Sequence, residues 1–315
     1  MRPFVNFLLG LNPYPELLIR RIFYSNNFFK KLKEIRVKKK NKKVEVIPDL
    51  FKKVVNHIKT LGIKKGDILI VHSSMDGLAS TGASPKQYID MLFELVGEEG
   101  TLVIPAFPLY KKSITNVDHS GNQDILVYEP KRTICGTGML PNIFLRYPAV
   151  IRSEFPINSL AAKGPCAEEM MRNNLESDLA HGKNSSWGYC IEHYAKVLFL
   201  GVKSNRSTTI VHAAEDLMDS EWPIENWYEK KQFVIKRKQD EQLITVRSRR
   251  PYWFRFVTSH YRSRVFIKNN LLQESEVDGI SVGYIPNSRK LVDFLAMRAI
   301  KGNLFFKVPR KYWKK

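Results

Sequence analysis

An α/β fold, in which helices flank a central β-sheet, is the fold class that this sequence predicts. Three short apolar runs indicate buried strands at residues 68–71, 102–104 and 197–200, and each precedes a polar loop. Helical patterns lie between these runs. Because 43% of the 315 residues are hydrophobic and 11% are aromatic, the chain can bury a large core. We expect one folded body over residues 48–315, preceded by an extension over residues 1–47.

The body begins with a helix, a strand and a loop. Apolar residues at positions 50, 51, 54, 55, 58 and 61 form one face of a helix, which ends at Gly62. The strand at residues 68–71 follows after a turn. The polar loop at residues 72–77 then lies at the carboxyl end of that strand, which is where open α/β sheets bind ligands.

The next elements repeat this order. Ser84 is placed to cap a helix that has Pro85 at its first position and apolar residues as far as Leu95. The predicted strands at residues 102–104 and 197–200 follow this helix in the chain. A further helix over residues 210–218 is expected after the last of them.

Positive charge is concentrated at the two ends of the chain. The formal net charge is +20, with +9 over residues 1–47, −3 over residues 48–228 and +14 over residues 229–315. A protein that binds nucleic acid usually carries positive charge on its folded module, so this distribution argues against a nucleic-acid partner. The three cysteines have no paired spacing, and a reducing cytoplasm fits them best.

The extension over residues 1–47 combines apolar and aromatic side chains with a lysine-rich run at residues 30–43. No apolar stretch approaches the roughly 20 residues that cross a bilayer. No small-residue cleavage site follows the first apolar run, which argues against a signal peptide. One interpretation is peripheral contact with anionic lipid at the inner face of the membrane. The alternatives are a solvated extension or a helix that packs on the body.

Several segments in collinear order carry a resemblance to a known family. They are residues 70–75 (Ile-Val-His-Ser-Ser-Met), 96–105, 136–141, 152–156 (Arg-Ser-Glu-Phe-Pro), and 197–202 followed by 208–215. Together they resemble the aminoglycoside 3-N-acetyltransferase family over residues 49–216, with a weaker match onward to residue 306. The resemblance implies that family's mixed central sheet flanked by helices. It also implies transfer of an acetyl group from acetyl coenzyme A to an amine of an aminocyclitol antibiotic.

Such a transfer needs a general base, because an amine is mostly protonated at neutral pH and must lose a proton before it attacks a thioester. Histidine is the natural base near pH 7. His212 follows the strand at residues 197–202 and a threonine pair, and Glu215 lies three residues further on the same helical face. A histidine beside a carboxylate on a helix surface is the ordinary alternative. With the resemblance, we predict that His212 is the base and Glu215 its partner, and that His212 and the loop at residues 72–77 converge on one cleft.

The coenzyme contacts are less sharply specified. The sequence has no evident phosphate-binding lysine loop and no dinucleotide glycine fingerprint. The resemblance places coenzyme contacts in two segments, at His72, Ser73, Ser74, Met75 and Gly77 and at Arg152 and Ser153. Backbone N–H groups and hydroxyls would hold the pantetheine and phosphates, and the arginine would bind a phosphate. The alternative is structural, since the same groups also stabilise turns. Acetyl-CoA or another acyl-CoA is the expected cosubstrate, and no metal is expected.

Two positions depart from the family pattern. Members commonly read Arg-Ser-x-His-Pro where this chain has Phe155 in place of the histidine. The segment in which members are thought to place a carboxylate partner for the histidine corresponds here to residues 246–255, which contain no acid. A base histidine needs a partner that fixes its tautomer. Either Glu215 or another carboxylate takes this role, or the chemistry is lost.

The C-terminal region also bears on the substrate, because its arginines would repel a polycationic aminoglycoside and suit an anionic acceptor. We expect substrate contacts at Thr209, Glu215 and Arg250. The preferred interpretation is an acyl-CoA-dependent N-acyltransferase of a nucleotide- or lipid-linked amino sugar in surface-polysaccharide biosynthesis. The first alternative is an aminoglycoside 3-N-acetyltransferase that confers antibiotic resistance. The second is a catalytically lapsed binding protein at a membrane surface.

Overall fold

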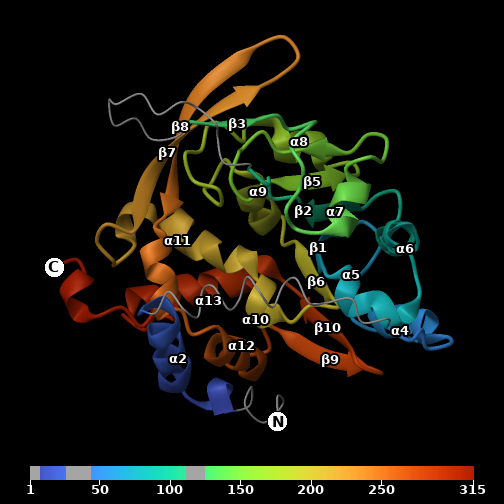
Figure 1. Cartoon of the computed structure of the whole chain (residues 1–315), viewed down its shortest axis with the longest axis horizontal. Helices are drawn as coiled ribbons and strands as arrows, with labels where there is room; N and C mark the ends of the chain where they lie inside the picture. Colours follow the sequence, from blue (N-terminus) through green and yellow to red (C-terminus); the bar gives the residue numbers. More distant parts are fainter. Residues whose placement is uncertain (1–7, 26–43, 111–124) are drawn as a thin grey trace.

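A seven-stranded mixed sheet forms the centre of the computed structural model, which describes residues 8–25, 44–110 and 125–315 (Figure 1). The strand order is β4-β5-β2-β1-β6-β10-β9. The strands are β1 (Ile68–Ser73), β2 (Thr101–Pro105), β4 (Ile151–Arg152), β5 (Leu160–Lys163), β6 (Lys196–Leu200), β9 (Gln273–Val277) and β10 (Ile280–Ile285). The predicted fold class is confirmed.

The three strands predicted from sequence lie side by side in the middle of this sheet. β1 runs parallel to both β2 and β6, and Ile70 pairs with Val103 on one side and with Val197 on the other. Central parallel strands are buried on both faces, which explains their continuous apolar sequences. Their carboxyl ends lie at one edge of the sheet, where the candidate site is found.

Successive residues of β1 face two different cores, because side chains alternate along a strand. Leu69 and Val71 pack against one layer of helices, namely α4 (Leu50–Lys59), α6 (Pro85–Val96) and α7 (Met139–Phe144). Ile70 packs against the other layer, namely α8 (Ala167–Arg172), α9 (Ser186–Glu192), α11 (Ala213–Met218), α12 (Ser259–Lys268) and α13 (Ser288–Ile300).

The start of α6 agrees with the sequence prediction. Ser84 Oγ accepts a hydrogen bond from the backbone N–H of Gln87, and the Gln87 side chain accepts one from the backbone N–H of Ser84. Pro85 occupies the first helical position. These reciprocal bonds satisfy two backbone donors that the helix itself leaves unpaired.

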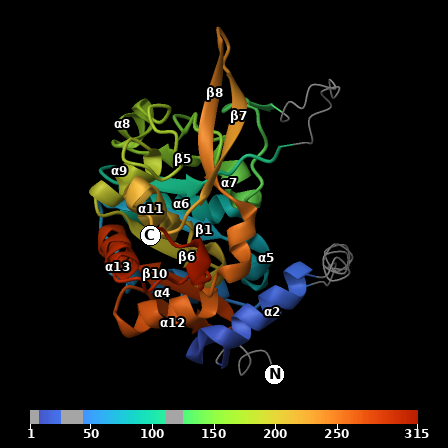
Figure 2. The ribbon, with the colours of Figure 1, turned by 90° about the vertical axis from the view of Figure 1, so that its left-hand side faces the viewer.

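A second, smaller sheet stands apart from the main body. It contains β3 (Leu126–Tyr128), β7 (Tyr228–Lys236) and β8 (Glu241–Arg249), and the β7–β8 hairpin projects outward (Figures 1 and 2). Phe155, which replaces the histidine of the family pattern, is buried against Tyr128, Phe233 and Val246. At this position an apolar side chain therefore joins the hairpin to the body.

Part of the N-terminal extension packs on the body. Helix α2 (Pro13–Ser25) lies against α12 and the short helix η4 (Pro251–Phe256) (Figure 2). Glu16 is buried and accepts hydrogen bonds from Ser259 Oγ at 2.7 Å and from the backbone N–H of His260 at 2.9 Å. Burial alone would raise the pKa of Glu16, but interactions with the His260 side chain, Ser259, the His260 backbone and Arg20 lower it to about 2. Residues 13–25 therefore form a helix that packs on the body, which was one of the alternatives for the extension. The lysine-rich run lies outside the described residues.

Among the described helices, none is both long and apolar enough to span a membrane.

Candidate active site

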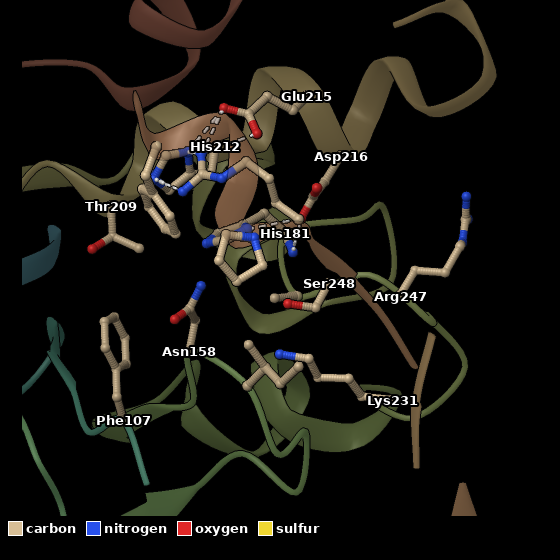
Figure 3. A pocket seen from close by; sticks show the side chains of 15 residues that line it. Phe107, Asn158, His181, Thr209, His212, Glu215, Asp216, Lys231, Arg247 and Ser248 are labelled. Atoms are coloured by element: carbon tan, nitrogen blue, oxygen red, sulfur yellow. Dashed lines mark hydrogen bonds and ion pairs between the residues drawn. The ribbon is translucent and has the colours of Figure 1, made fainter. Parts of the chain in front are cut away.

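Two adjoining cavities lie near the carboxyl ends of the central strands. One, of about 320 Å³, is lined by His212 and by residues of the β7–β8 hairpin such as Lys231 and Ser248 (Figure 3). The other, of about 220 Å³, is lined by His72 and Ser73. Phe107 and Thr209 line both cavities. The two segments that we expected to converge therefore meet across these shared residues. We call the first the acceptor cavity and the second the coenzyme cavity, after the ligands that the sequence analysis predicts for His212 and for His72 and Ser73.

The predicted histidine–carboxylate pair is in direct contact. A short helix, η2 (Thr209–His212), leads into α11, so Glu215 lies one turn beyond His212. His212 Nδ1 is 2.9 Å from Glu215 Oε1, and Trp227 Nε1 donates to Glu215 Oε2 at 3.0 Å. Burial would raise the pKa of Glu215, but the charge of Arg249 and the hydrogen bonds from His212 and Trp227 lower it, so this carboxylate is ionised at neutral pH.

Arg249, at the end of β8, also contacts both members of this pair. Its Nη1 lies 2.6 Å from His212 Nδ1 and 3.2 Å from each oxygen of Glu215, and its Nη2 lies 3.3 Å from His212 Nε2. The guanidinium also stacks over the rings of Phe254 and Phe306. Burial, and then the charge of Arg249, lower the pKa of His212 to about 4. His212 is therefore neutral at pH 7.

A second histidine–carboxylate pair, which the sequence analysis missed, lines the same cavity. His181 Nδ1 lies 2.8 Å from Asp216 Oδ2, and Tyr228 donates its hydroxyl to Asp216 Oδ1 at 3.0 Å. The His181 ring centroid is 6.0 Å from that of His212. Its Nε2 atom is buried and has no hydrogen-bond partner. The two members of this pair are 35 residues apart, so no local spacing could have indicated it.

The loop after β1 divides into residues that line the coenzyme cavity and residues that shape the loop. His72 and Ser73 line the cavity. Ser74 Oγ accepts from Gly77 N–H and caps the short helix α5 (Met75–Leu78), and Met75 packs on the first core. A side chain on Gly77 would place its Cβ 1.8 Å from the carbonyl oxygen of Gly201, so only glycine fits there.

The His72 ring is enclosed by aromatic groups. Its centroid is 5.2 Å from that of Phe199 and 6.4 Å from that of Trp187, in stacked arrangements. Its Nε2 atom is buried without a partner, and burial lowers the pKa of His72 to about 3. The imidazole is consequently neutral, and it forms part of the wall of the coenzyme cavity.

Arg152 and Ser153 lie away from both cavities. The guanidinium of Arg152 is buried and donates to backbone carbonyls, including that of Ala106 at 2.6 Å and that of Thr133 at 2.5 Å. Ser153 Oγ is fully buried, hydrogen bonds to Asn174 Oδ1 and accepts from a backbone N–H. Arg152 lines a separate cavity of about 830 Å³. These contacts favour the structural alternative for both residues.

Arg250 does not occupy the position that we predicted for it. Its side chain is exposed, and its Nε donates to the carbonyl of Tyr228 at 2.9 Å. Arg247 and Arg249 line the acceptor cavity, whereas Arg250 does not. The position of Arg250 therefore gives no support to the predicted substrate contact, whereas Arg247 and Arg249, two residues apart, share the face of β8 that lines the cavity.

The coenzyme cavity also contains a cation that the sequence analysis did not single out. Arg206, in the short helix α10 (Ser204–Ser207), is the charged member among the described residues that line this cavity. Its guanidinium suits a phosphate. The sequence did not indicate Arg206, because its neighbours are polar residues that form no recognisable motif.

No group of three potential metal ligands is found within the described parts of the chain. Cys135, Cys166 and Cys190 are all free thiols.

Comparison with protein families gives a match to the aminoglycoside 3-N-acetyltransferase model over residues 70–296. The chain belongs to this family. The matched region contains His212, Glu215 and the central strands of the sheet.

Individual relatives agree with this family assignment. Aminoglycoside N(3)-acetyltransferase IX of Micromonospora chalcea is 31% identical over 175 residues, which are 53% of this chain and 62% of that protein. The prophage-derived acetyltransferase-like protein YokD of Bacillus subtilis is 28% identical over 184 residues, covering 53% of this chain and 65% of that protein. The aligned segment thus spans less than two thirds of either relative.

Solved structures of the family share the fold. The structure described as AAC-IIIb with coenzyme A superposes with a TM-score of 0.68 at 20% identity, covering 81% of this chain and 97% of that one. A variant of AAC(3)-IVa in complex with a gentamicin gives a TM-score of 0.64 at 23% identity, covering 87% of this chain and 95% of that one.

Proposed function

We propose that this protein transfers an acetyl group, or another short acyl group, from its coenzyme A thioester to an amine. The observation that carries the proposal is the position of the His212–Glu215 pair in the acceptor cavity, next to the residues shared with the coenzyme cavity. A thioester that enters through one cavity and an amine that enters through the other would meet at Thr209 and Phe107. The coenzyme A in the related AAC-IIIb structure supports this choice of cosubstrate.

The chemistry follows from the tautomer of His212. When Glu215 accepts a hydrogen bond from Nδ1–H, the lone pair of Nε2 is free to take the proton of the attacking amine. The amine nitrogen then bonds to the thioester carbonyl carbon, and the carbon–sulfur bond breaks as the tetrahedral intermediate collapses. The imidazolium returns its proton to the departing thiolate. Glu215 stabilises the imidazolium throughout, because it is buried and ionised.

The comparisons favour an aminoglycoside as the acceptor over the lipid- or nucleotide-linked amino sugar of our preferred sequence interpretation. The relatives cited above are named for aminoglycoside acetylation, and the related AAC(3)-IVa structure holds gentamicin. Nothing in these comparisons supports a role in surface-polysaccharide biosynthesis. Aminoglycoside acetylation is therefore the first activity to test.

Release of coenzyme A thiol from acetyl-CoA, measured against a panel of aminoglycosides and amino sugars, tests the proposal. We expect acceptor-dependent release from the wild-type protein, and we expect His212→Ala to reduce it strongly. Coenzyme binding without release for any acceptor would instead support the catalytically lapsed alternative.

We also propose that helix α2 makes peripheral contact with an anionic membrane. Its inner face is held by Glu16, but Tyr14, Leu18 and Ile22 lie at helical spacing on the outer face and are 70%, 61% and 49% exposed. Exposed apolar side chains at this spacing suit an interfacial helix. The lysine-rich run that follows in the sequence would add attraction to anionic headgroups.

A further inference from the structure

Arg249 and Glu215 compete for the same nitrogen of His212. Glu215 can only accept a hydrogen bond, so its contact with Nδ1 requires a proton on that atom. Arg249 can only donate, so its contact with Nδ1 at 2.6 Å requires a lone pair there. Both hydrogen bonds cannot exist at once on a single ring nitrogen.

The choice between these two hydrogen bonds decides whether His212 can act as a base. If Arg249 donates to Nδ1, the proton of the neutral ring lies on Nε2, and the side chain offers no lone pair to an amine there. If the proton lies on Nδ1 instead, the Nη2 atom of Arg249, 3.3 Å from Nε2, occupies the lone pair that the amine would need. If Arg249 moves away, Nδ1–H donates to Glu215 and Nε2 becomes the acceptor. The arrangement with Arg249 on His212 is therefore an inactive one.

Three nearby titratable side chains act electrostatically on His212. Glu215 on α11, Arg249 on β8 and His181 in the loop before α9 are the groups whose charges act on it. Glu215 is already bonded to Trp227 and His212, and Asp216 is bonded to His181 and Tyr228. Among the described residues that line the cavity, these two are the only carboxylates. No further carboxylate within that set is available to hold Arg249 elsewhere.

The cavity instead presents other cations. Lys231 points into it from β7, and among the described residues it forms an ion pair with the half-buried Glu229 at 3.1 Å (Figure 3). Arg247 is neutralised by Asp178 and Asp219 and points away from the histidines (Figure 3). An incoming polycation would thus meet Lys231 and Arg249 without an unpaired carboxylate to receive it.

We propose that Arg249 is a specificity-determining residue that recognises an anionic group, a phosphate or a carboxylate, on the amine acceptor. By binding that group, Arg249 leaves His212 and permits the tautomer in which Nε2 is the base. The acceptor class is an amine that carries its own negative charge, such as a phosphorylated or acidic amino sugar. This inference rests on the proposed acetyl transfer, and it predicts an anionic acceptor in place of the aminoglycoside that the comparisons favour.

Binding of the acceptor is the first step of the reaction. The planar guanidinium forms paired hydrogen bonds to the anionic group of the acceptor. His212 then releases its Nε2 proton to solvent water and takes up a proton from water at Nδ1, where it donates to Glu215. Nε2 now carries the lone pair and removes a proton from the amine. The new nitrogen–carbon bond forms, the carbon–sulfur bond breaks, and the proton passes to the thiolate of coenzyme A. No oxidant, reductant or further reactant is required.

Matched acceptors test the specificity. We would compare glucosamine with glucosamine 6-phosphate and with muramic acid, which carry a phosphate and a carboxylate respectively, and with kanamycin as a polycation. For the wild-type protein we expect kcat/KM to be about 10–100-fold higher for at least one anionic acceptor than for glucosamine, the range for a charge-assisted hydrogen-bond pair. Arg249→Gln should abolish this preference. Equal or better use of kanamycin, or a preference that survives Arg249→Gln, would overturn the proposal.

Titration of His212 by NMR provides a readout that does not depend on turnover. With labelled histidine, and with His212→Ala to assign the resonance, we expect the His212 midpoint to rise by about 1–3 pH units in Arg249→Gln and in wild-type protein saturated with glucosamine 6-phosphate or muramic acid. Arg250→Gln, which removes the neighbouring exposed guanidinium, is the matched control and should leave the midpoint unchanged.

The two measurements separate the failure of this inference from the failure of the proposed function. Acetyl transfer without any movement of the His212 midpoint would overturn the role of Arg249 and leave the acetyltransferase function standing. A midpoint that moves as expected in a protein that releases no coenzyme A thiol would support anion recognition by Arg249 and overturn the acetyl transfer.

Discussion

Replacement of His72 by phenylalanine should make the protein more resistant to acid. The folded chain holds the His72 ring between Phe199 and Trp187, and burial there lowers the pKa to about 3. The unfolded chain takes up a proton near the ordinary histidine pKa of 6.5. Acid therefore favours the unfolded chain between these two values, because only the unfolded chain binds the proton there.

The size of this effect follows from the difference between the two pKa values. One pH unit corresponds to about 1.4 kcal/mol, so between pH 6.5 and pH 4.5 the wild-type chain loses about 3 kcal/mol of unfolding free energy through His72 alone. Phenylalanine cannot titrate, has a similar ring, and forfeits no hydrogen bond at Nε2, which has no partner. The loss of stability on going from neutral pH to pH 4.5 should shrink by about 3 kcal/mol in the variant.

Urea unfolding at pH 7.0 and pH 4.5, followed by tryptophan fluorescence, measures this difference. His72→Gln is the matched control, because it also removes the titrating group but keeps a polar side chain. Its stability at pH 7.0 should be lower, whereas its change with pH should equal that of His72→Phe. If wild-type protein and His72→Phe lose the same free energy between the two pH values, the buried neutral histidine is refuted.

Three further changes test other parts of the molecule. His212→Ala should lower turnover about 10²–10⁴-fold with nearly unchanged coenzyme A affinity, compared by steady-state kinetics and calorimetry, because a general base acts in the transition state. Arg152→Ala should lower the unfolding free energy by about 2 kcal/mol or more, measured with urea, because it leaves buried carbonyls unpaired; reduced coenzyme A affinity at unchanged stability would restore the phosphate role. Replacement of Tyr14, Leu18 and Ile22 by serine should reduce the salt-resistant part of co-sedimentation with anionic vesicles, whereas equal pelleting of the two proteins would contradict the membrane contact.

The central layer of the fold could be predicted because its signals are local. Ile70 lies in a run of buried apolar residues, and Ser84 and Pro85 mark a helix start within three residues of its capping partner Gln87. His212 and Glu215 were predictable for the same reason, since one helical turn joins them.

The rest of the site depends on contacts between distant parts of the chain. His181 reaches Asp216 across 35 residues, and Arg249 reaches His212 across 37. The sequence did indicate an arginine-rich strand, but the choice between Arg249 and Arg250 depends on the register of β8 against β7. Glu16 pairs with Ser259 over 243 residues, which explains why the composition of the extension alone left its packing open.

The surroundings of Glu215 explain how Arg249 could leave the site without destabilising it. An unpaired carboxylate as buried as Glu215 would cost several kcal/mol. Glu215 would still accept from Trp227 and His212 after Arg249 has moved, and the buried guanidinium of Arg262 on α12 also acts on it electrostatically. Arg262 has a buried Nε without a hydrogen-bond partner, so its charge is not neutralised through that atom. Of the two arginines that act on Glu215, Arg249 lines the acceptor cavity and Arg262 does not, so Arg249 is the one that an anionic acceptor can bind.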